Sequence, residues 1–349
     1  MSSARPSSDG PSPARERGPA RDALDAGREH EVAGHLDAAA VSYRLAVELA
    51  DASADPTLLV EALRRLGVVR HRQSASEPAI ALCTGSYRKA LELGDRILAG
   101  WAQNALAGFS FEAGDLLEAR TQYLSALELA SDSAPLLGRI EQNLGILDSV
   151  QGRHGDALAH YRRALEAFEL AGDEAGCAIA LHNLGLVASR RGELEDAARS
   201  LDRSAAIAAR IGDVYLAALC ELHRAELLHA RQLYDEASRR AESALLRFES
   251  LGDVRGRAEA SRVIGQVLRD TGRPVQAEER LRAAVSLAVE DGWLLGQAEA
   301  SRELARLHQR AGLDGEALSL LGEAQRLFRR LEARLEVEDV AQRMAELAA

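Results

Sequence analysis

The sequence predicts an all-α protein, a right-handed α-solenoid of about eight helical hairpins that ends in a C-terminal capping helix. A set of small residues recurs about every 40 positions along nearly the whole chain. Apolar residues follow helical spacing on both sides of each recurrent turn residue. With 47% hydrophobic residues, only 4% aromatic residues and 8 prolines, the composition suits helices rich in Ala and Leu better than sheets.

One turn residue marks each repeat, and successive markers lie 40 residues apart except for a single step of 38. The markers are Gly34, Ser74, Gly114, Gly152, Gly192, Gln232, Gly272 and Gly312. Five residues after each marker stands an alanine, namely Ala39, Ala79, Ala119, Ala157, Ala197, Ala237, Ala277 or Ala317. Seven residues before it stands Gly or Ala. A repeat of this length cannot bury its apolar face alone, so the repeats must stack on one another.

Each repeat is predicted to be a helical hairpin. Leu144 and Leu147 lie at helical spacing before Gly152, and Ala157 and Tyr161 lie at helical spacing after it. Gly-Asp pairs at 94–95, 172–173, 212–213 and 252–253 should separate consecutive repeats, with Gly ending one helix and Asp capping the next. The small residues should let the two helices of a hairpin approach closely.

In chain order, residues 1–20 are rich in Ser, Pro and Arg and are predicted to form a disordered tail. Residues 21–331 are predicted to form the solenoid, and 332–349 the capping helix. The eight repeats are expected at about 21–56, 57–95, 96–133, 134–173, 174–213, 214–253, 254–293 and 294–331.

These residues resemble the tetratricopeptide repeat family. Its unit carries Leu-Gly, a turn Gly, and then Ala, an aromatic residue and Ala, as in Leu144-Gly145, Gly152, Ala157, Tyr161 and Ala164. Asn-Leu-Gly triplets at 143–145 and 183–185, with Gly-Asp linkers, are similar to the branch of kinesin light chains, Pins-type scaffolds and bacterial Rap-type peptide receptors. The resemblance covers about residues 21–331. It departs from the family pattern at Ser74, Gln232 and Arg224, and the last four repeats lack the Tyr.

The resemblance implies that the first helix of each repeat lines a concave groove that binds segments of other proteins. The groove positions carried over from the family are Trp101, Asn104, Phe111, Arg139, Gln142, Asn143, Ile146, His182, Asn183, Leu186, Arg190, Leu219, Leu222, His223 and Glu226. Further along, they are His229, Glu259, Arg262, Gln266, Arg269, Glu299, Arg302, Glu303 and Arg306.

Two pairs of groove residues allow alternative interpretations. Asn143 and Asn183 occupy the same position in consecutive repeats, and an amide side chain has the donor and the acceptor that a bound peptide group needs. They could instead bond neighbouring helices within the solenoid. Trp101 and Phe111 could anchor a partner side chain, or pack between repeats.

Several classes of function are disfavoured by the sequence. A net charge of −11 argues against nucleic acid as the main partner, because such binding depends on many Lys and Arg contacts. The three cysteines have no metal-ligand spacing, and we expect no cofactor. His30 and His35 are five residues apart, one more than a zinc-protease motif allows. No apolar run suits a membrane span or a secretory signal, so we expect a cytoplasmic protein without a membrane partner. Lys89 is the only lysine beside many arginines, which favours a G+C-rich bacterial genome.

Two functions are therefore considered. The first is a non-catalytic scaffold or adaptor that binds a peptide or a partner protein in the groove, with a regulatory role as one version. The alternative is an accessory subunit of an enzyme or biosynthetic assembly, self-associating as a homo-oligomer through its end repeats. The identity of the partner is not predicted.

Overall fold

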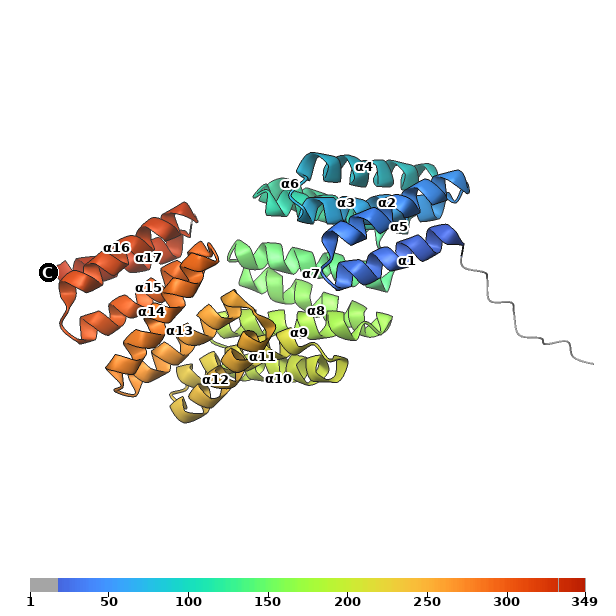
Figure 1. Cartoon of the computed structure of the whole chain (residues 1–349). Helices are drawn as coiled ribbons and strands as arrows, with labels where there is room; N and C mark the ends of the chain where they lie inside the picture. Colours follow the sequence, from blue (N-terminus) through green and yellow to red (C-terminus); the bar gives the residue numbers. More distant parts are fainter. Residues whose placement is uncertain (1–17, 332, 349) are drawn as a thin grey trace, which may run out of the picture. The chain divides into compact units, whose positions relative to one another are not determined.

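The computed structural model describes residues 18–331 and 333–348, and the first 17 residues of the predicted tail lie outside this part (Figure 1). Within it, the regular secondary structure consists of 17 helices, which confirms the all-α prediction. The chain divides into two compact units, residues 1–147 and 148–349, called here the N-terminal and C-terminal units. None of the described helices is both long and apolar enough to cross a lipid bilayer.

The N-terminal unit consists of three helical hairpins and most of a seventh helix. Its helices are α1 (Pro19–Val32), α2 (Leu36–Ala52), α3 (Pro56–Arg72), α4 (Ser76–Glu92), α5 (Arg96–Glu112), α6 (Leu116–Leu129) and α7 (Ala134–Val150), whose last residues belong to the next unit. Helix α2 packs against α3 and α4 against α5, and α6 shares an apolar cluster with α7. The first helices α1, α3 and α5 also contact one another in sequence. Successive hairpins therefore stack as in an α-solenoid.

The C-terminal unit repeats this arrangement and closes with one extra helix. Its helices are α8 (His154–Ala171), α9 (Glu174–Arg190), α10 (Leu194–Ile211), α11 (Val214–Ala230), α12 (Tyr234–Leu251), α13 (Val254–Asp270), α14 (Pro274–Glu290), α15 (Leu294–Arg310), α16 (Asp314–Arg330) and α17 (Arg334–Ala348). Helix α17 packs on α16, where Val340 is buried in one apolar cluster with Phe328.

All eight predicted turn markers adopt the left-handed conformation. Their φ angles lie between +60° and +85°, including those of Ser74 (+61°) and Gln232 (+60°), which stand where the other repeats have Gly. The predicted Asp caps are also present, because the side chains of Asp95 and Asp213 accept hydrogen bonds from the backbone N–H groups of residues three positions later. The spacing in the sequence therefore locates the turns correctly.

The close approach of paired helices is confirmed as well. A β-carbon at Gly185 would lie 2.7 Å from Cγ of Leu201, and one at Gly265 would lie 2.6 Å from Cγ of Leu281. In each case the small residue seven positions before the marker lies against the larger residue nine positions after it. Overpacking such a contact costs about 1–3 kcal/mol, which explains why these positions stay small.

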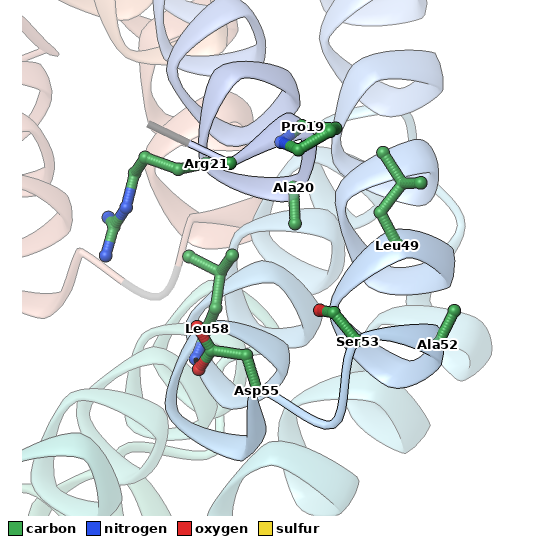
Figure 2. A pocket seen from close by; sticks show the side chains of 9 residues that line it. Pro19, Ala20, Arg21, Leu49, Ala52, Ser53, Asp55 and Leu58 are labelled. Atoms are coloured by element: carbon green, nitrogen blue, oxygen red, sulfur yellow. Dashed lines mark hydrogen bonds between the residues drawn. The ribbon is translucent and has the colours of Figure 1, made fainter. Parts of the chain in front are cut away.

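Helix α1 begins later within its repeat than α3 does within the next one. Helix α1 begins 15 residues before its marker (34 − 19), whereas α3 begins 18 residues before its own (74 − 56). Gly18 therefore occupies the register position of Leu58, which is only 4% exposed. A hollow of about 510 Å³ lies beside this start, between the end of α2 and the beginning of α3 (Figure 2). Pro19 and Ala20, assigned above to the tail, are helical instead, since Pro suits the first turn of a helix.

Candidate functional site

A groove in the N-terminal unit, called here the N-terminal groove, is lined mainly by the first helices α3, α5 and α7. Its volume is about 500 Å³. Its lining residues are Val68, His71, Arg72, Asn104, Ala105, Gly108, Phe109, Phe111, Glu112, Tyr123, Arg139, Asn143 and Ile146. The first helices supply nearly all of them because their outward-facing residues are not needed to pack the hairpins.

Two asparagines from neighbouring helices meet in this groove. Asn143 on α7 donates a hydrogen bond from Nδ2 to Oδ1 of Asn104 on α5, over 3.0 Å. Both side chains are only partly buried. An amide has two donor hydrogens and two acceptor lone pairs, so the pair retains hydrogen-bonding capacity beyond the bond it makes.

An aromatic and ionic contact closes one edge of the N-terminal groove. The ring of His71 stacks on Phe109, with 4.1 Å between centroids and 20° between planes. Nε2 of the same histidine lies 2.9 Å from Oε2 of Glu112 on the next first helix. This edge is therefore held by contacts between α3 and α5, and Phe111 remains partly exposed beside it.

Trp101 lies under a cation. The guanidinium carbon of Arg64 is 5.4 Å from the centroid of the Trp101 ring, which is within cation–π range. Burial, followed by the neighbouring Arg65, lowers the pKa of Arg64 to about 10. Trp101 itself is partly buried against the apolar cluster of the third and fourth repeats, so it both packs and faces Arg64.

A second groove, in the C-terminal unit, is strongly charged and is called here the C-terminal groove. It has a volume of about 270 Å³ and is lined by Gly185, Leu186, Ser189, Arg190, Leu201, His223, Glu226, Glu259, Arg262 and Glu299. Arg262 stands between the three carboxylates. It lies 2.7 Å from Glu226, 3.6 Å from Glu259 and 3.9 Å from Glu299.

The three carboxylates differ in how well they are compensated. Burial opposes the ionisation of Glu226, but Arg262 outweighs it and the pKa of Glu226 is lowered. Burial raises the pKa of Glu299, because Arg262 is more distant and Glu259 adds negative charge. The Arg262 guanidinium thus outweighs the effect of burial at Glu226 but not at Glu299.

Two of the three predicted groove histidines come together. Nε2 of His182 lies 3.1 Å from Nδ1 of His223, between α9 and α11. Burial, followed by the neighbouring His223, lowers the pKa of His182 to about 3, against a weaker opposing effect of Asn183. His229 contacts Asp270 instead, at 2.8 Å. In the described part of the chain, no three His, Cys, Asp or Glu side chains are arranged to hold a metal ion.

The structure separates the predicted groove residues by accessibility. Twelve of them line the two grooves, namely Asn104, Phe111, Arg139, Asn143, Ile146, Leu186, Arg190, His223, Glu226, Glu259, Arg262 and Glu299. Leu222 is 0% exposed, so its assignment to the groove surface is wrong, because its side chain belongs to an apolar core cluster with residues of α12 and α13. Gln142 and His182 are buried, and Asn183 and Leu219 are partly buried.

The second repeat also contributes to the N-terminal groove, although the predicted groove positions did not include it. Val68, His71 and Arg72 on α3 line the N-terminal groove, and Arg64 adjoins it. A usable signal was present, because Arg64 and Asn104 both stand ten residues before their markers, at positions 74 and 114. Carrying the groove positions one repeat further toward the N terminus would have included them.

Comparison with known proteins identifies the repeats. Residues 98–170 and 138–210 match the model of the tetratricopeptide repeat. No protein of curated function matches the sequence.

Solved structures of similar fold cover most of the chain. A signal transduction ATPase with numerous domains and a tetratricopeptide repeat sensor, from Pyrococcus horikoshii, has 16% identity and a TM-score of 0.67 over 91% of this chain. The matched part is 50% of that structure, so this chain spans about half its length. A Rap protein complexed with competence and sporulation factor has 13% identity and a TM-score of 0.61, over 94% of this chain and 97% of the other.

A third similar structure carries the name of an enzyme. It is aspartyl phosphate phosphatase F from Bacillus subtilis, with 13% identity and a TM-score of 0.63, over 82% of this chain and 75% of the other. At these identities the similarity shows the fold alone. This holds also for the Rap protein, although the sequence resembles Rap-type receptors. Residues 98–210 thus match the tetratricopeptide repeat, and the hairpins on either side of them stack in the same way.

Proposed function

We propose that the N-terminal groove binds an extended segment of a partner protein or a peptide, and that the protein is an interaction scaffold without chemistry of its own. The observation that carries this proposal is the amide pair of Asn104 and Asn143 within the groove. After their mutual hydrogen bond, Nδ2 of Asn104 and Oδ1 of Asn143 are left as a donor and an acceptor. A peptide group of the ligand presents the complementary C=O and N–H. The bond between the two amides then positions the clamp in advance.

Apolar walls on both sides of the amides support the same proposal. Val68, Phe111 and Ile146 come from α3, α5 and α7, and all three are partly exposed in the groove. A partner side chain that covers them contributes about 25 cal/mol per Å² of apolar surface removed from water. The groove therefore combines backbone recognition by amides with side-chain recognition by apolar surface.

The binding role is also supported by the state of the titratable groove residues. A general base must be able to accept a proton from a reacting group at the working pH. Glu226 is held ionised by Arg262, and the buried His182 is directed at His223. Because similar folds include a protein named as a phosphatase and a domain of an ATPase, we base the non-catalytic proposal on these side chains.

The Rap protein structure, which contains competence and sporulation factor, gives a precedent for ligand binding on this fold. On that precedent, we propose that occupancy of the groove by a ligand regulates a partner of this chain. The C-terminal groove, with its paired charges, is then available for a second contact of the same partner.

Selection from a library of short random peptides on the immobilised full chain tests the binding proposal. Ile146→Arg should abolish retention of the selected peptides, because a bulky cation then fills the wall of the groove. Leu124→Arg on α6, at a position that is 45% exposed and outside the groove, is the matched control and should retain them. The proposal fails if wild type selects nothing above background, or if Ile146→Arg binds the selected peptides as wild type does while both variants keep the wild-type circular dichroism.

A further inference from the structure

Arg64 is a cation without a counter-ion. Among the described residues, its guanidinium forms neither an ion pair nor a hydrogen bond, and Nε is enclosed without any acceptor. The arginines at the same register position in later repeats do have acidic partners. Arg262 lies 2.7 Å from Glu226, and Arg302 lies 3.8 Å from Asp339. Of the three arginines at this register position in the described chain, Arg64 in the second repeat is thus the one without an acidic partner.

The nearby acids are already occupied by other arginines. Glu61 pairs with Arg21 at 3.4 Å and also with Arg28. Glu31 pairs with Arg65 at 3.3 Å and accepts a hydrogen bond from the hydroxyl of Tyr43 at 2.6 Å. The facing sides of α1 and α3 thus carry more guanidinium groups than carboxylates, although the whole chain has a net charge of −11.

The unpaired cation adjoins the N-terminal groove. Arg64 lies one helical turn before Val68 on α3, and Trp101 lies one turn before Asn104 on α5, and both Val68 and Asn104 line the groove. The ring of Trp101, 5.4 Å from the guanidinium carbon, holds Arg64 in place by cation–π attraction. The side chains therefore continue the groove by one turn toward the helix starts.

We propose that Arg64 and Trp101 form a carboxylate subsite at this end of the N-terminal groove, filled by an acidic side chain or the terminal carboxylate of the bound segment. The subsite deepens the proposed binding function and rests on it. The planar guanidinium presents a fork of N–H donors that matches the two oxygens of a carboxylate. The ligand carboxylate supplies the negative charge that Arg64 lacks, because Glu31 and Glu61 pair with other arginines. The amide pair of Asn104 and Asn143, one turn away, binds the adjoining backbone of the ligand.

Tryptophan fluorescence tests the subsite without any peptide. The chain has two tryptophans, so Trp293→Phe leaves Trp101 as the only one. Phenylacetate should then change the emission of Trp101 in a saturable way that weakens with added salt, whereas the uncharged phenylacetamide should not. Arg64→Gln should weaken the response at least about tenfold, since charge-assisted bidentate pairs are among the strongest hydrogen bonds. Arg88→Gln, which removes the same charge from an exposed position on α4, should leave it unchanged.

The proposal is overturned if acid and amide act alike on the Trp293→Phe protein, or if Arg64→Gln responds as Arg88→Gln does. An array of the selected peptides, each with Glu or Gln at its acidic positions and with a free or an amidated C terminus, identifies the source of the carboxylate. Preference for Glu assigns a side chain, and preference for the free end assigns the terminus. If the peptides show neither preference, the subsite is overturned. The groove proposal still stands in that case, provided that wild type retains the peptides and Ile146→Arg does not.

Discussion

Nη1 of Arg269 lies 2.5 Å from Oε2 of Glu303, and both side chains are almost fully enclosed between α13 and α15. Arg306 reaches the other oxygen of the same carboxylate at 2.6 Å. Burial opposes the charge on Glu303, but Arg306 and Arg269 outweigh it and lower the pKa of Glu303 below its ordinary value. The seventh and eighth repeats are thus joined by the buried ion pair of Arg269 and Glu303.

Glu303→Gln should therefore destabilise the C-terminal unit by about 3 kcal/mol, because removing one member of a buried pair leaves the other uncompensated. Urea unfolding followed by circular dichroism measures the loss, with the exposed Glu279→Gln on α14 as the control. A carboxylate of lowered pKa stabilises the fold above its unfolded pKa. The difference between wild type and Glu303→Gln should accordingly persist at neutral pH and shrink below about pH 4.5, the ordinary Glu value. A difference independent of pH would contradict the ionic account.

The buried His182 should make stability depend on pH in a different range. Its pKa of about 3 lies below the ordinary 6.5, so the unfolded chain binds a proton that the folded chain excludes. Stability from this residue is complete above pH 6.5 and falls toward pH 3, by up to about 1.4 kcal/mol per pH unit. Urea midpoints at pH 7 and pH 5 should differ less in His182→Gln than in wild type. Equal differences in the two proteins would refute this, and the exposed His35→Gln serves as the control.

Helix contact in the fifth repeat should show compensation between two positions. Gly185→Ala places a β-carbon 2.7 Å from Cγ of Leu201 and should cost about 1–3 kcal/mol. Leu201→Ala alone leaves a cavity and should cost about 2–5 kcal/mol. The double variant reproduces the natural pair Ala225 and Ala241 of the sixth repeat, so its cost should be clearly below the sum. Additive costs in thermal unfolding would contradict the proposed contact.

Replacing Gln232 by Gly should stabilise the protein by up to about 1 kcal/mol. Gln232 has a φ of +60°, where a side chain is strained and Gly is not. The reciprocal change, Gly272→Ala at the marker of the next repeat, has a φ of +74° and should destabilise by a similar amount. Thermal unfolding of both variants checks the sign. A less stable Gln232→Gly would mean that the side chain makes a contact worth more than the strain.

Much of the fold is predictable from the sequence because its determinants are local. A residue in the left-handed conformation, such as Gly152, and an Asp cap, such as Asp213, act within one turn of their own positions. The small residues are equally readable, since Gly185 faces Leu201 and Gly265 faces Leu281 at the same separation in the sequence. The start of α1 was less readable, because Pro19 belongs to a Pro-rich stretch and also begins a helix.

The candidate site was predictable only in part, because it depends on which side chains find partners. The register placed Asn104 and Asn143 in the groove, but their mutual hydrogen bond depends on side-chain conformations on two helices. Leu222 shares its register position with Asn104, yet it turns into the apolar core of its own unit. Likewise, no sequence pattern distinguishes the unpaired Arg64 from Arg262, whose acids come from three different helices.

The separation of roles within each repeat has a consequence for how such a protein changes over evolution. Positions such as Gly185 and Ala197 hold the hairpin together, whereas the position ten residues before the marker is partly exposed in the second, third and seventh repeats, where it carries Arg64, Asn104 and Arg262. Mutation at that position alters the chemistry offered to a ligand while the packing stays the same. One scaffold can thus acquire new binding preferences one repeat at a time, without passing through an unstable intermediate sequence.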